Sequence, residues 1–383
     1  MLRLSGLFFL FFAFLIGAEP EALYLTWVDD PTTTMAVVWF GEEGKVLYRI
    51  EGEKEWSSQE GEKHKARYLS QLEGLKEGST YLFKLEGSQA TYKFRTLPKI
   101  LSREVRFTVG GDVFYYWGNQ TFQRMNHAVA HDDPDFVVLG GDIAYTTGRK
   151  KAFKSRDWEL NRWMQFFQEM QKGMTRDDGR MIPMLPVIGN HDVHQKKTKD
   201  EEMFYEVFPF PEEGKAYRNI VFGDYLDLVL LDTGHTSPID GDQTAWLEKT
   251  LEQVAFPFVF AVYHVGAYPS YYAYNGQAAQ KVRKFWVPLF EKARISGAFE
   301  HHSHAFKKTY PIKEGKVDPE GVIYFGDGSW GVPPREVYQA WYLEIAESVN
   351  ACWFVHLTNK EARLEARTET GEIKASVKIG RRL

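Results

Sequence analysis

The sequence of 383 residues contains a single cysteine, Cys352, so no disulfide bond can form within the chain and no cysteine-rich metal cluster is possible. The net charge is only −5, which argues against a protein that coats nucleic acid and gives no polybasic membrane patch. It has no internal repeat, no G-x-x-x-x-G-K-[ST] phosphate loop and no Ser-His-Asp order. These absences leave a globular protein, 44% hydrophobic, whose chemistry must come from other side chains.

A long apolar run lies at the N-terminus. Residues 4–16 are almost all Leu, Phe and Ala; they follow Arg3 and precede Gly17 and Ala18. This pattern predicts a signal peptide over residues 1–18, cleaved after Ala18, and an exported protein that is secreted or periplasmic, or vacuolar or lysosomal in a eukaryote. The run is shorter than the roughly 18 residues of a membrane span, and an uncleaved N-terminal anchor is the alternative.

Short strand-like segments separated by turns follow between residues 23 and 96. Their regular spacing predicts an antiparallel β-sandwich over residues 19–98, of the size of a fibronectin type III module. The turn at residues 75–80 precedes Tyr81, which is typical of the tyrosine corner of such sandwiches, in which the hydroxyl bonds back to the main chain. None of these residues indicates catalysis.

From residue 103 apolar strands alternate with helices, which predicts an α/β domain over residues 99–383. Apolar residues at helical spacing predict helices at 119–131, 157–172, 242–253 and 280–293. Strand-like runs at 217–222 and 226–231 flank Gly223 and Asp224 and predict a hairpin. Strands of alternating character return after residue 341.

Five apolar runs in this domain each lead into residues that can bind a metal ion. In chain order these are Asp112, Asp142 with Tyr145, Asn190, His264, and His302 with His304. One such residue at a strand end would be an ordinary turn residue, but five strand ends of one kind indicate a site. Ligand crevices of open α/β sheets lie at the carboxyl ends of the strands.

Seven candidate ligands are too many for one zinc ion and suit two ions that share a carboxylate. Asp142 is the natural bridge, because it leaves the central strand. A phenolate from Tyr145 favours ferric iron, whereas imidazole and amide ligands suit Zn²⁺, Fe²⁺ or Mn²⁺. His302 and His304 lie two residues apart in a segment expected to be extended, so both side chains would point the same way.

The succession G-D-x-x, G-D-x-x-Y, G-N-H-D, an apolar run ending in His, and H-x-H strongly resembles the purple acid phosphatases within the calcineurin-like metallophosphoesterases. The resemblance extends from about residue 103 to the C-terminus, and the preceding sandwich is similar to that of the large, plant-type members. It implies a four-layer α/β/β/α metallophosphoesterase core after the N-terminal sandwich.

The resemblance also implies a role for each candidate residue. It assigns the ferric ion to Asp112, Asp142, Tyr145 and His304. It assigns the divalent ion to Asp142, Asn190, His264 and His302. His191, beside the amide ligand, would act on the phosphate and the leaving group without binding metal.

The sequence departs from the family pattern at three places. Plant-type members carry further histidines about ten residues after the His264 position, where this chain has Ala273 and Tyr274. Their absence leaves His191, Tyr274 or solvent as the proton donor. His301 replaces a glycine, either as an extra phosphate-facing group or as a turn residue. Phe114 also replaces a glycine, which predicts a narrower opening beside the ferric site.

The function that follows is an exported acid phosphatase, in which an Fe³⁺–M²⁺ centre and a metal-bound hydroxide hydrolyse phosphate monoesters. The expected partner is a small phosphate ester, with no nucleic acid and no stable membrane anchor after signal cleavage. A phosphodiesterase or nucleotide hydrolase on the same scaffold is the nearest alternative. Loops 148–156 and 268–277 would border the substrate and decide between them. A non-catalytic binding protein with a vestigial metal site is a more distant alternative.

Overall fold

The computed structural model describes residues 19–147, 155–194, 202–253, 255–326 and 328–382. The predicted signal peptide at residues 1–18 and most of the predicted 148–156 substrate loop lie outside these ranges. Within them, no helix combines the length and the apolar character needed to cross a membrane.

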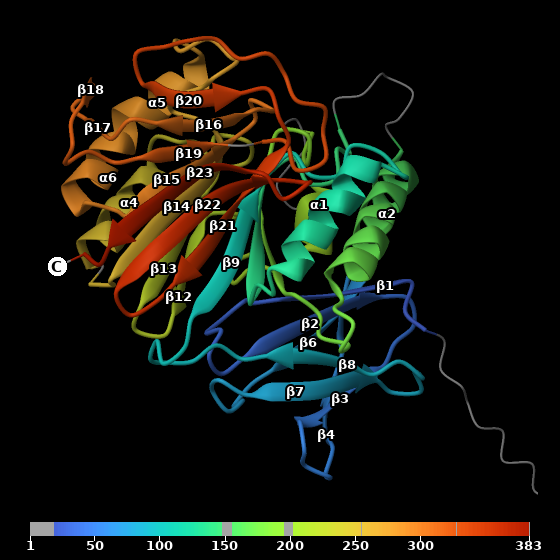
Figure 1. Ribbon diagram of the computed structural model, residues 1–383. Coiled ribbons are helices and arrows are strands. Elements are labelled where there is room, and N and C mark those ends of the chain that lie inside the picture. Colours follow the sequence, from blue (N-terminus) through green and yellow to red (C-terminus); the bar gives the residue numbers. More distant parts are fainter. Residues whose placement is uncertain (1–18, 148–154, 195–201, 254, 327, 383) are drawn as a thin grey trace, which may run out of the picture.

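Two four-stranded antiparallel sheets form the N-terminal sandwich, drawn in blue in Figure 1. One sheet has the order β1 (Ala22–Thr26), β2 (Met35–Phe40), β6 (Arg67–Leu72) and β5 (Glu62–His64). The other has the order β4 (Ser57–Glu60), β3 (Lys45–Ile50), β7 (Thr80–Leu85) and β8 (Tyr92–Arg95). The hydroxyl of Tyr81 accepts a hydrogen bond from the Lys76 amide at 2.8 Å, as the predicted tyrosine corner requires.

A six-stranded sheet begins the α/β part. Its order is β11 (Met184–Val187), β10 (Phe136–Gly140), β9 (Val105–Gly110), β21 (Ala351–Leu357), β22 (Glu361–Thr368) and β23 (Ile373–Gly380). The first three strands are parallel to one another, and the C-terminal strands join antiparallel to β9. β10 and β11 are fully buried, and β9 is buried except at Arg106, because α1 (Gln120–His131) and α2 (Arg156–Met174) cover the outer face of these strands.

A seven-stranded sheet faces the first. Its order is β12 (Arg218–Phe222), β13 (Leu226–Leu231), β14 (Phe258–Val265), β15 (Gly297–His301), β19 (Tyr324–Gly326), β16 (Phe306–Thr309) and β20 (Leu343–Glu347). Its four neighbouring strands β13, β14, β15 and β19 are parallel to one another. Its outer face is covered by α4 (Asp242–Gln253), α5 (Gln277–Phe285) and α6 (Val287–Ala293). The predicted four-layer α/β/β/α arrangement after an N-terminal sandwich is therefore confirmed.

Aromatic side chains fill the space between the two sheets. Phe107 of β9 stacks on Phe136 of β10, with ring centroids 5.0 Å apart, and meets Phe260 of β14 edge-on at 6.3 Å. The core continues into the sandwich without a break, because Trp27 packs against Phe136 at 5.8 Å and Phe222 at 6.0 Å. The aligned sheets bring the carboxyl ends of their parallel strands to one edge of the molecule.

The sequence predicted most helix boundaries to within a few residues. The predicted helix at 280–293 is wrong in one respect, because it is two helices separated at Trp286. Pro288 in the first turn of α6 has no amide hydrogen to continue the ladder of α5. The five-residue α3 (Met203–Val207) and the short hairpin of β17 (Ile312–Lys313) and β18 (Lys316–Val317) were not predicted.

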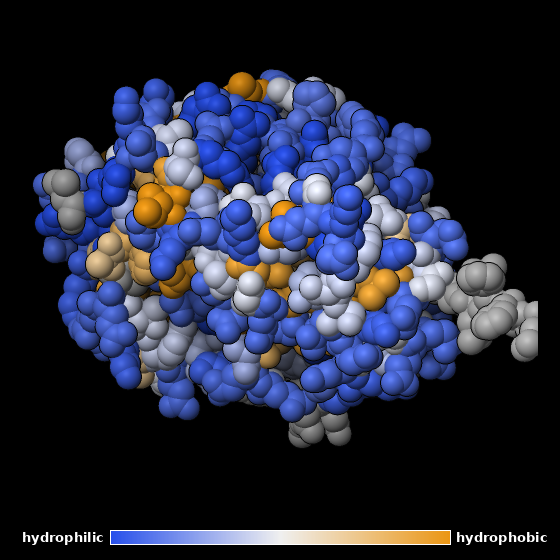
Figure 2. Space-filling model, turned by 90° about the horizontal axis from the view of Figure 1, so that it is seen from below, coloured by the Kyte–Doolittle hydropathy of each residue, from blue (hydrophilic) through white to orange (hydrophobic). Residues whose placement is uncertain are grey.

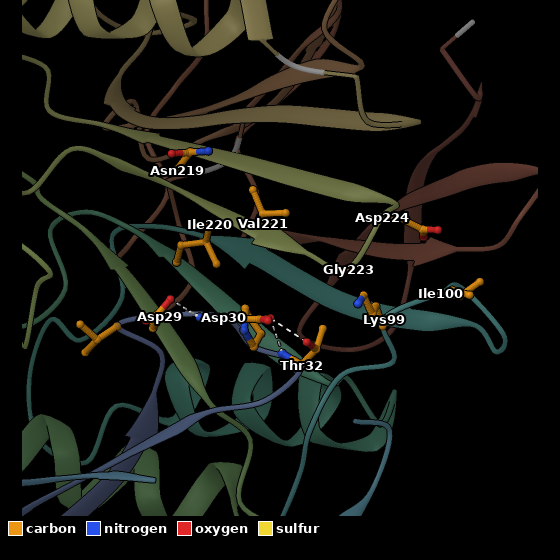
Figure 3. Close-up of a pocket in the computed structure, with 12 residues that line it drawn as sticks. Asp29, Asp30, Thr32, Lys99, Ile100, Asn219, Ile220, Val221, Gly223 and Asp224 are labelled. Carbon is orange, nitrogen blue, oxygen red and sulfur yellow. Dashed lines mark hydrogen bonds between the residues drawn. The ribbon is translucent and has the colours of Figure 1, made fainter. Parts of the chain in front are cut away.

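Seen from below, the surface is mostly hydrophilic, and its hydrophobic residues form small separate groups across the middle (Figure 2). A crevice of about 760 Å³ lies between the β1–β2 turn of the sandwich and β12 (Figure 3). Asp30 lines it, and the Asp30 carboxylate is engaged by the amide and hydroxyl of Thr32, both at 2.8 Å. Since no candidate metal ligand lines this crevice, it belongs to the junction of the two parts and not to the predicted site.

Candidate metal centre

All seven predicted ligands converge at the edge where the parallel strands of both sheets end. Asp112, Asp142 and Asn190 follow β9, β10 and β11, which lie side by side. His264 lies near the end of β14, and His302 and His304 follow β15 in the facing sheet. The parallel registers of both sheets thus explain how residues nearly 200 positions apart come into contact.

One group of ligand atoms gathers around Asp112. Ligand atoms of Asp112, Asp142 and His304 lie within 4.8 Å of one another. The Tyr145 hydroxyl lies 2.9 Å from Oδ1 of Asp112 and 3.0 Å from Nε2 of His304, and that nitrogen lies 2.8 Å from the same Asp112 oxygen. These four residues are the ones that the resemblance assigns to the ferric ion.

A second group gathers around His264. Ligand atoms of Asp142, His264 and His302 lie within 4.8 Å of one another. Nε2 of His264 lies 3.2 Å from Oδ2 of Asp142, 3.2 Å from Oδ1 of Asn190 and 3.2 Å from Nδ1 of His302. Asp142 is common to both groups, at the position where the sequence predicts the shared carboxylate.

The donor set fits cations. Nδ1 of His264 donates to the Gly140 carbonyl at 2.9 Å, so Nε2 is the ring nitrogen that faces the oxygens of Asp142 and Asn190. Oδ2 of Asp142 is buried and makes no hydrogen bond to a described residue. Burial opposes charge on His264, yet Asp142 and Asp112 raise its pKa to about 9. The carboxylates of Asp142 and Asp112 thus stabilise positive charge at this position, which suits a cation.

The pKa values of two further ligands point the same way. Burial and the carboxylates of Asp112 and Asp142 raise the pKa of Tyr145 well above its usual value, so a phenolate would form there only beside a cation. Burial and the neighbouring His264 lower the pKa of His302 to about 3. His302 is therefore neutral and keeps a lone pair for a metal ion.

Five of the seven ligands have a left-handed backbone conformation. Their φ angles are 54° at Asp112, 51° at Asp142, 51° at Tyr145, 70° at His302 and 52° at His304. Each such residue costs about 1–3 kcal/mol and persists only where its surroundings enforce it. The H-x-H segment is consequently not extended, contrary to the prediction: β15 ends at His301, and the two left-handed residues turn both imidazoles into the site.

Gly141 and Gly189 allow the β10 and β11 loops to approach the ligands closely. A Cβ atom on Gly141, whose φ is 91°, would lie 2.6 Å from the His264 ring. One on Gly189 would lie 2.1 Å from the Asp142 amide nitrogen. These distances are far below van der Waals contact, which gives a physical reason for glycine in the G-G-D and G-N-H-D motifs.

Asp192 holds these two loops together, a role that the sequence did not predict. One oxygen of this buried carboxylate accepts a hydrogen bond from the Ile143 amide at 2.8 Å, and the other accepts one from the Gly189 amide at 2.9 Å. Asp192 therefore fixes the loop of Asp142 relative to the loop of Asn190. The position is within the quoted G-N-H-D motif, but the motif alone does not give its partners.

His191 lies over the first group without joining it. Its ring stacks on that of Tyr145 with centroids 4.8 Å apart, and its amide donates to Oδ1 of Asp142 at 2.6 Å. Nδ1 lies 3.0 Å from the Thr147 carbonyl, and because a carbonyl only accepts, Nδ1 carries the hydrogen. Nε2 is thus left for a substrate in this half-buried position.

Three predicted features lie elsewhere than expected. His301 is buried, and its ring lies against Gly111 and Gly140 beneath the ligands, so it is neither phosphate-facing nor a turn residue. Tyr274 packs between Tyr342, at 5.4 Å, and the Arg283 guanidinium, at 3.7 Å, and not against the ligands. Phe114 is buried against Phe122 and Phe166, so it does not narrow the opening.

Tyr272, rather than Tyr274, is the residue of this loop that reaches the centre. Its ring stacks on His302 with centroids 4.3 Å apart and an interplanar angle of 14°. Tyr272, Asn190 and His302 line a pocket of about 250 Å³, which also contains His235 and the first turn of α5. The sequence predicted that loop 268–277 borders the substrate, but the spacing of its tyrosines could not show which one would do so.

Residues 105–304 match the calcineurin-like phosphoesterase family. Purple acid phosphatase 15 of Arabidopsis thaliana is 24% identical over 370 residues, which cover 82% of this chain and 66% of the relative. Purple acid phosphatase 22 of the same plant is 22% identical over 332 residues, which cover 81% and 70%. The chain thus spans about two thirds of the length of these curated relatives.

Solved structures share the fold. A purple acid phosphatase, PPD1, from yellow lupin (Lupinus luteus) seeds superposes with a TM-score of 0.77 at 15% identity and covers 94% of this chain and 74% of its own. The structure of PhoD superposes with a TM-score of 0.69 at 11% identity, over 94% and 92%. Together with the family match to more than half of the sequence, this means that the chain belongs to the calcineurin-like phosphoesterase family and resembles the purple acid phosphatases within it.

Proposed function

We propose that the protein is an exported acid phosphatase that hydrolyses phosphate monoesters at a dinuclear centre of Fe³⁺ and Zn²⁺, Fe²⁺ or Mn²⁺. The observation that carries the proposal is the pair of ligand groups that share Asp142. One group offers carboxylates, a phenol and an imidazole, which suits a trivalent ion. The other offers imidazoles and an amide oxygen, which suits a divalent ion.

Asp112, Asp142, Tyr145 and His304 would hold the ferric ion, and Asp142, Asn190, His264 and His302 would hold the divalent ion. When bound, two such ions neutralise the phosphoryl oxygens and lower the pKa of water so that it can attack phosphorus. The chain itself holds the ligands in place, with Asp192 joining two of the loops and Gly140 fixing the tautomer of His264.

His191 is the proposed catalytic residue. The Thr147 carbonyl and the stacked Tyr145 ring hold its imidazole in one orientation. A protonated Nε2 would donate to a phosphoryl oxygen or to the oxygen of the leaving alcohol. Tyr274 has no such position, so the geometry favours His191 over Tyr274 as the proton donor. His301 is buried beneath the ligands and does not face a substrate either.

The 250 Å³ pocket beside Asn190 and His302 is the proposed position of the leaving group. Its wall combines Tyr272, Val265 and Pro269 with the polar His235. A pocket of this size suits a small alcohol as the leaving group. Export of the protein rests on the N-terminal pattern described above.

The visible absorption spectrum and iron content of the purified protein test the proposal. A phenolate–ferric charge-transfer band, absent in Tyr145→Phe, is expected, together with faster hydrolysis of p-nitrophenyl phosphate than of bis(p-nitrophenyl) phosphate. A colourless, active protein with only zinc or manganese would contradict the ferric site. Faster cleavage of the diester would favour the phosphodiesterase, and a metal-free protein that hydrolyses no phosphate ester, even after reconstitution, would favour the binding protein.

A further inference from the structure

Arg335 lies at the rim of the metal centre, on the segment between β19 and β20. Its amide donates to the His304 carbonyl at 2.7 Å, which ties the Arg335 main chain directly to the H-x-H loop. Neither a sequence motif nor the family resemblance marks this residue. It lies more than 30 positions after His304 in the sequence, and only the fold brings it to the site.

A stack of planar groups connects Arg335 to a metal ligand. Its guanidinium lies 5.2 Å from the ring centroid of Tyr272 and 4.9 Å from that of Tyr271. Nη1 donates to the Tyr272 hydroxyl and approaches the His302 carbonyl at 3.4 Å. Because Tyr272 stacks on His302, the imidazole, the phenol and the guanidinium form one rigid set.

The loop that carries Tyr272 is itself held firmly. The Tyr338 hydroxyl lies 2.7 Å from the carbonyls of both Pro269 and Tyr272, and the Tyr342 hydroxyl donates to Pro269 at 2.7 Å. The position of the Arg335 guanidinium is therefore determined before a ligand binds. Such preorganisation lowers the entropic cost of binding.

Arg335 retains donors that none of the residues described by the structure accepts from. Nε and Nη2 make no hydrogen bond to any described residue, and no described carboxylate pairs with this half-buried side chain. The Tyr272 hydroxyl accepts one hydrogen from Arg335 and still has its own to donate. The nearby part of the fold also contains an arginine whose side chain is engaged by the main chain. One terminal nitrogen of Arg162 donates to the carbonyls of Phe114, Tyr115 and Ala144.

We propose that Arg335, together with the hydroxyl of Tyr272, binds the phosphoryl group of the substrate at oxygens that the metal ions leave free. This inference rests on the proposed function, because it names the group that positions the ester at the same site. A guanidinium fork matches two phosphoryl oxygens, and its charge strengthens both hydrogen bonds.

The test compares wild type and Arg335→Met as metal-loaded enzymes. The KM for p-nitrophenyl phosphate and the Ki of inorganic phosphate should rise together, by about tenfold to hundredfold, because a charge-assisted contact is lost. Metal content and the visible spectrum should not change. Arg335→Lys should give an intermediate rise, since an ammonium keeps the charge without the fork. Tyr272→Phe keeps the stacking and should raise the Ki by roughly two- to tenfold.

Arg283→Met is the matched control. Arg283 also lies over a tyrosine of this loop and donates to the carbonyls of Ala267 and Tyr274, but it contacts no metal ligand. A substitution that acts only by loosening the loop would therefore raise the Ki in this variant too. The proposal predicts an unchanged Ki for Arg283→Met, and an equal rise in both arginine variants would overturn it.

Calorimetric titration with inorganic phosphate distinguishes a failure of the phosphate subsite from a failure of the proposed hydrolase function. If wild type binds phosphate but hydrolyses no ester, the function is wrong, and weaker phosphate binding by Arg335→Met still supports the subsite. An unchanged phosphate affinity in Arg335→Met overturns the subsite while the hydrolase assignment stands. If the Met variant does not fold, as judged by its melting temperature, Arg335→Gln takes its place under the same criteria.

Discussion

The two ligand groups that share Asp142 differ in how they are enclosed. The group of Asp112, Tyr145 and His304 is buried, with side-chain distances of 2.8–3.0 Å, and all three residues have left-handed backbones. In the other group, His264 is buried, but Asn190 and His302 are half-buried and border the 250 Å³ pocket. The distances around His264 are longer, at 3.2 Å.

This difference in burial predicts that the two groups would exchange their ions at different rates. An ion in the enclosed group would exchange slowly, because the ligands are buried and already close to one another. An ion in the open group would exchange faster and would be the one that a substrate meets first. Loss of the shared carboxylate should abolish both sites, and changes farther away should act on one or on neither.

Asp142→Ala should have the largest effect. It removes the one carboxylate common to both groups, so neither ion would be held. We expect kcat/KM to fall by about three orders of magnitude or more, which corresponds to about 4 kcal/mol of transition-state stabilisation. Metal analysis should find both ions depleted. Retention of two ions per chain would show that Asp142 is not the bridge.

Brief treatment with a chelator should distinguish the two groups. The divalent ion should leave first, because Asn190 and His302 face the pocket, and the colour should persist after activity is lost. Asn190→Ala should reach the same state without chelator and lose about 10–100-fold in affinity for the second ion, measured by titration with Zn²⁺. Simultaneous loss of both ions would contradict the difference in enclosure.

Asp192→Asn tests the link between the loops of the two groups. An amide has only one accepting oxygen, so it can serve the Ile143 amide or the Gly189 amide but not both with equal strength. We expect activity to fall by about tenfold, with weaker metal affinity and a lower melting temperature. Full activity with unchanged metal binding would mean that the loops hold their positions independently of this carboxylate.

Asp227→Asn should change the melting temperature by a small, pH-dependent amount without affecting either ligand group. Burial raises the pKa of Asp227 to about 7, against the weaker effect of hydrogen bonds from Asn219 at 3.2 and 3.4 Å. The folded state thus prefers the protonated acid, and its contribution to stability is lost as the pH rises toward and past 7. The variant should melt above wild type at pH 8, and the gap should close near pH 4. A pH-independent gap would exclude this titration.

The sequence predicted which residues converge at this edge of the sheets, because each of them follows a recognisable local pattern. An apolar strand, a turn with glycine and a polar residue recur at Asp112, Asp142 and Asn190, and parallel strands place such ends together. The β-sandwich and the helices of the α/β part were likewise predictable from the period of apolar residues. The interrupted helix at Trp286 was also signalled, since Pro288 was in the sequence.

The remaining features depend on tertiary contacts that no local pattern encodes. Arg335 lies in a segment between strands, and only the path of that segment past His304 brings it to the rim. Tyr271, Tyr272 and Tyr274 are equivalent by spacing, and packing against Tyr342 or His302 decides which one faces the site. His301 was misassigned for the same reason, because its burial against Gly111 and Gly140 involves two other strands.

The hydrophobic core is continuous between the sandwich and the first sheet, and this continuity determines how the protein unfolds. Trp27 of the sandwich is fully buried against Phe136 and Phe222, and Tyr24 stacks on Phe167 of α2 at 4.6 Å. The strand before Asp142 therefore rests on residues of the N-terminal part. A chain shortened to its catalytic half would expose these aromatic faces and aggregate, and the intact protein should melt in one cooperative transition, with activity and sandwich structure lost together.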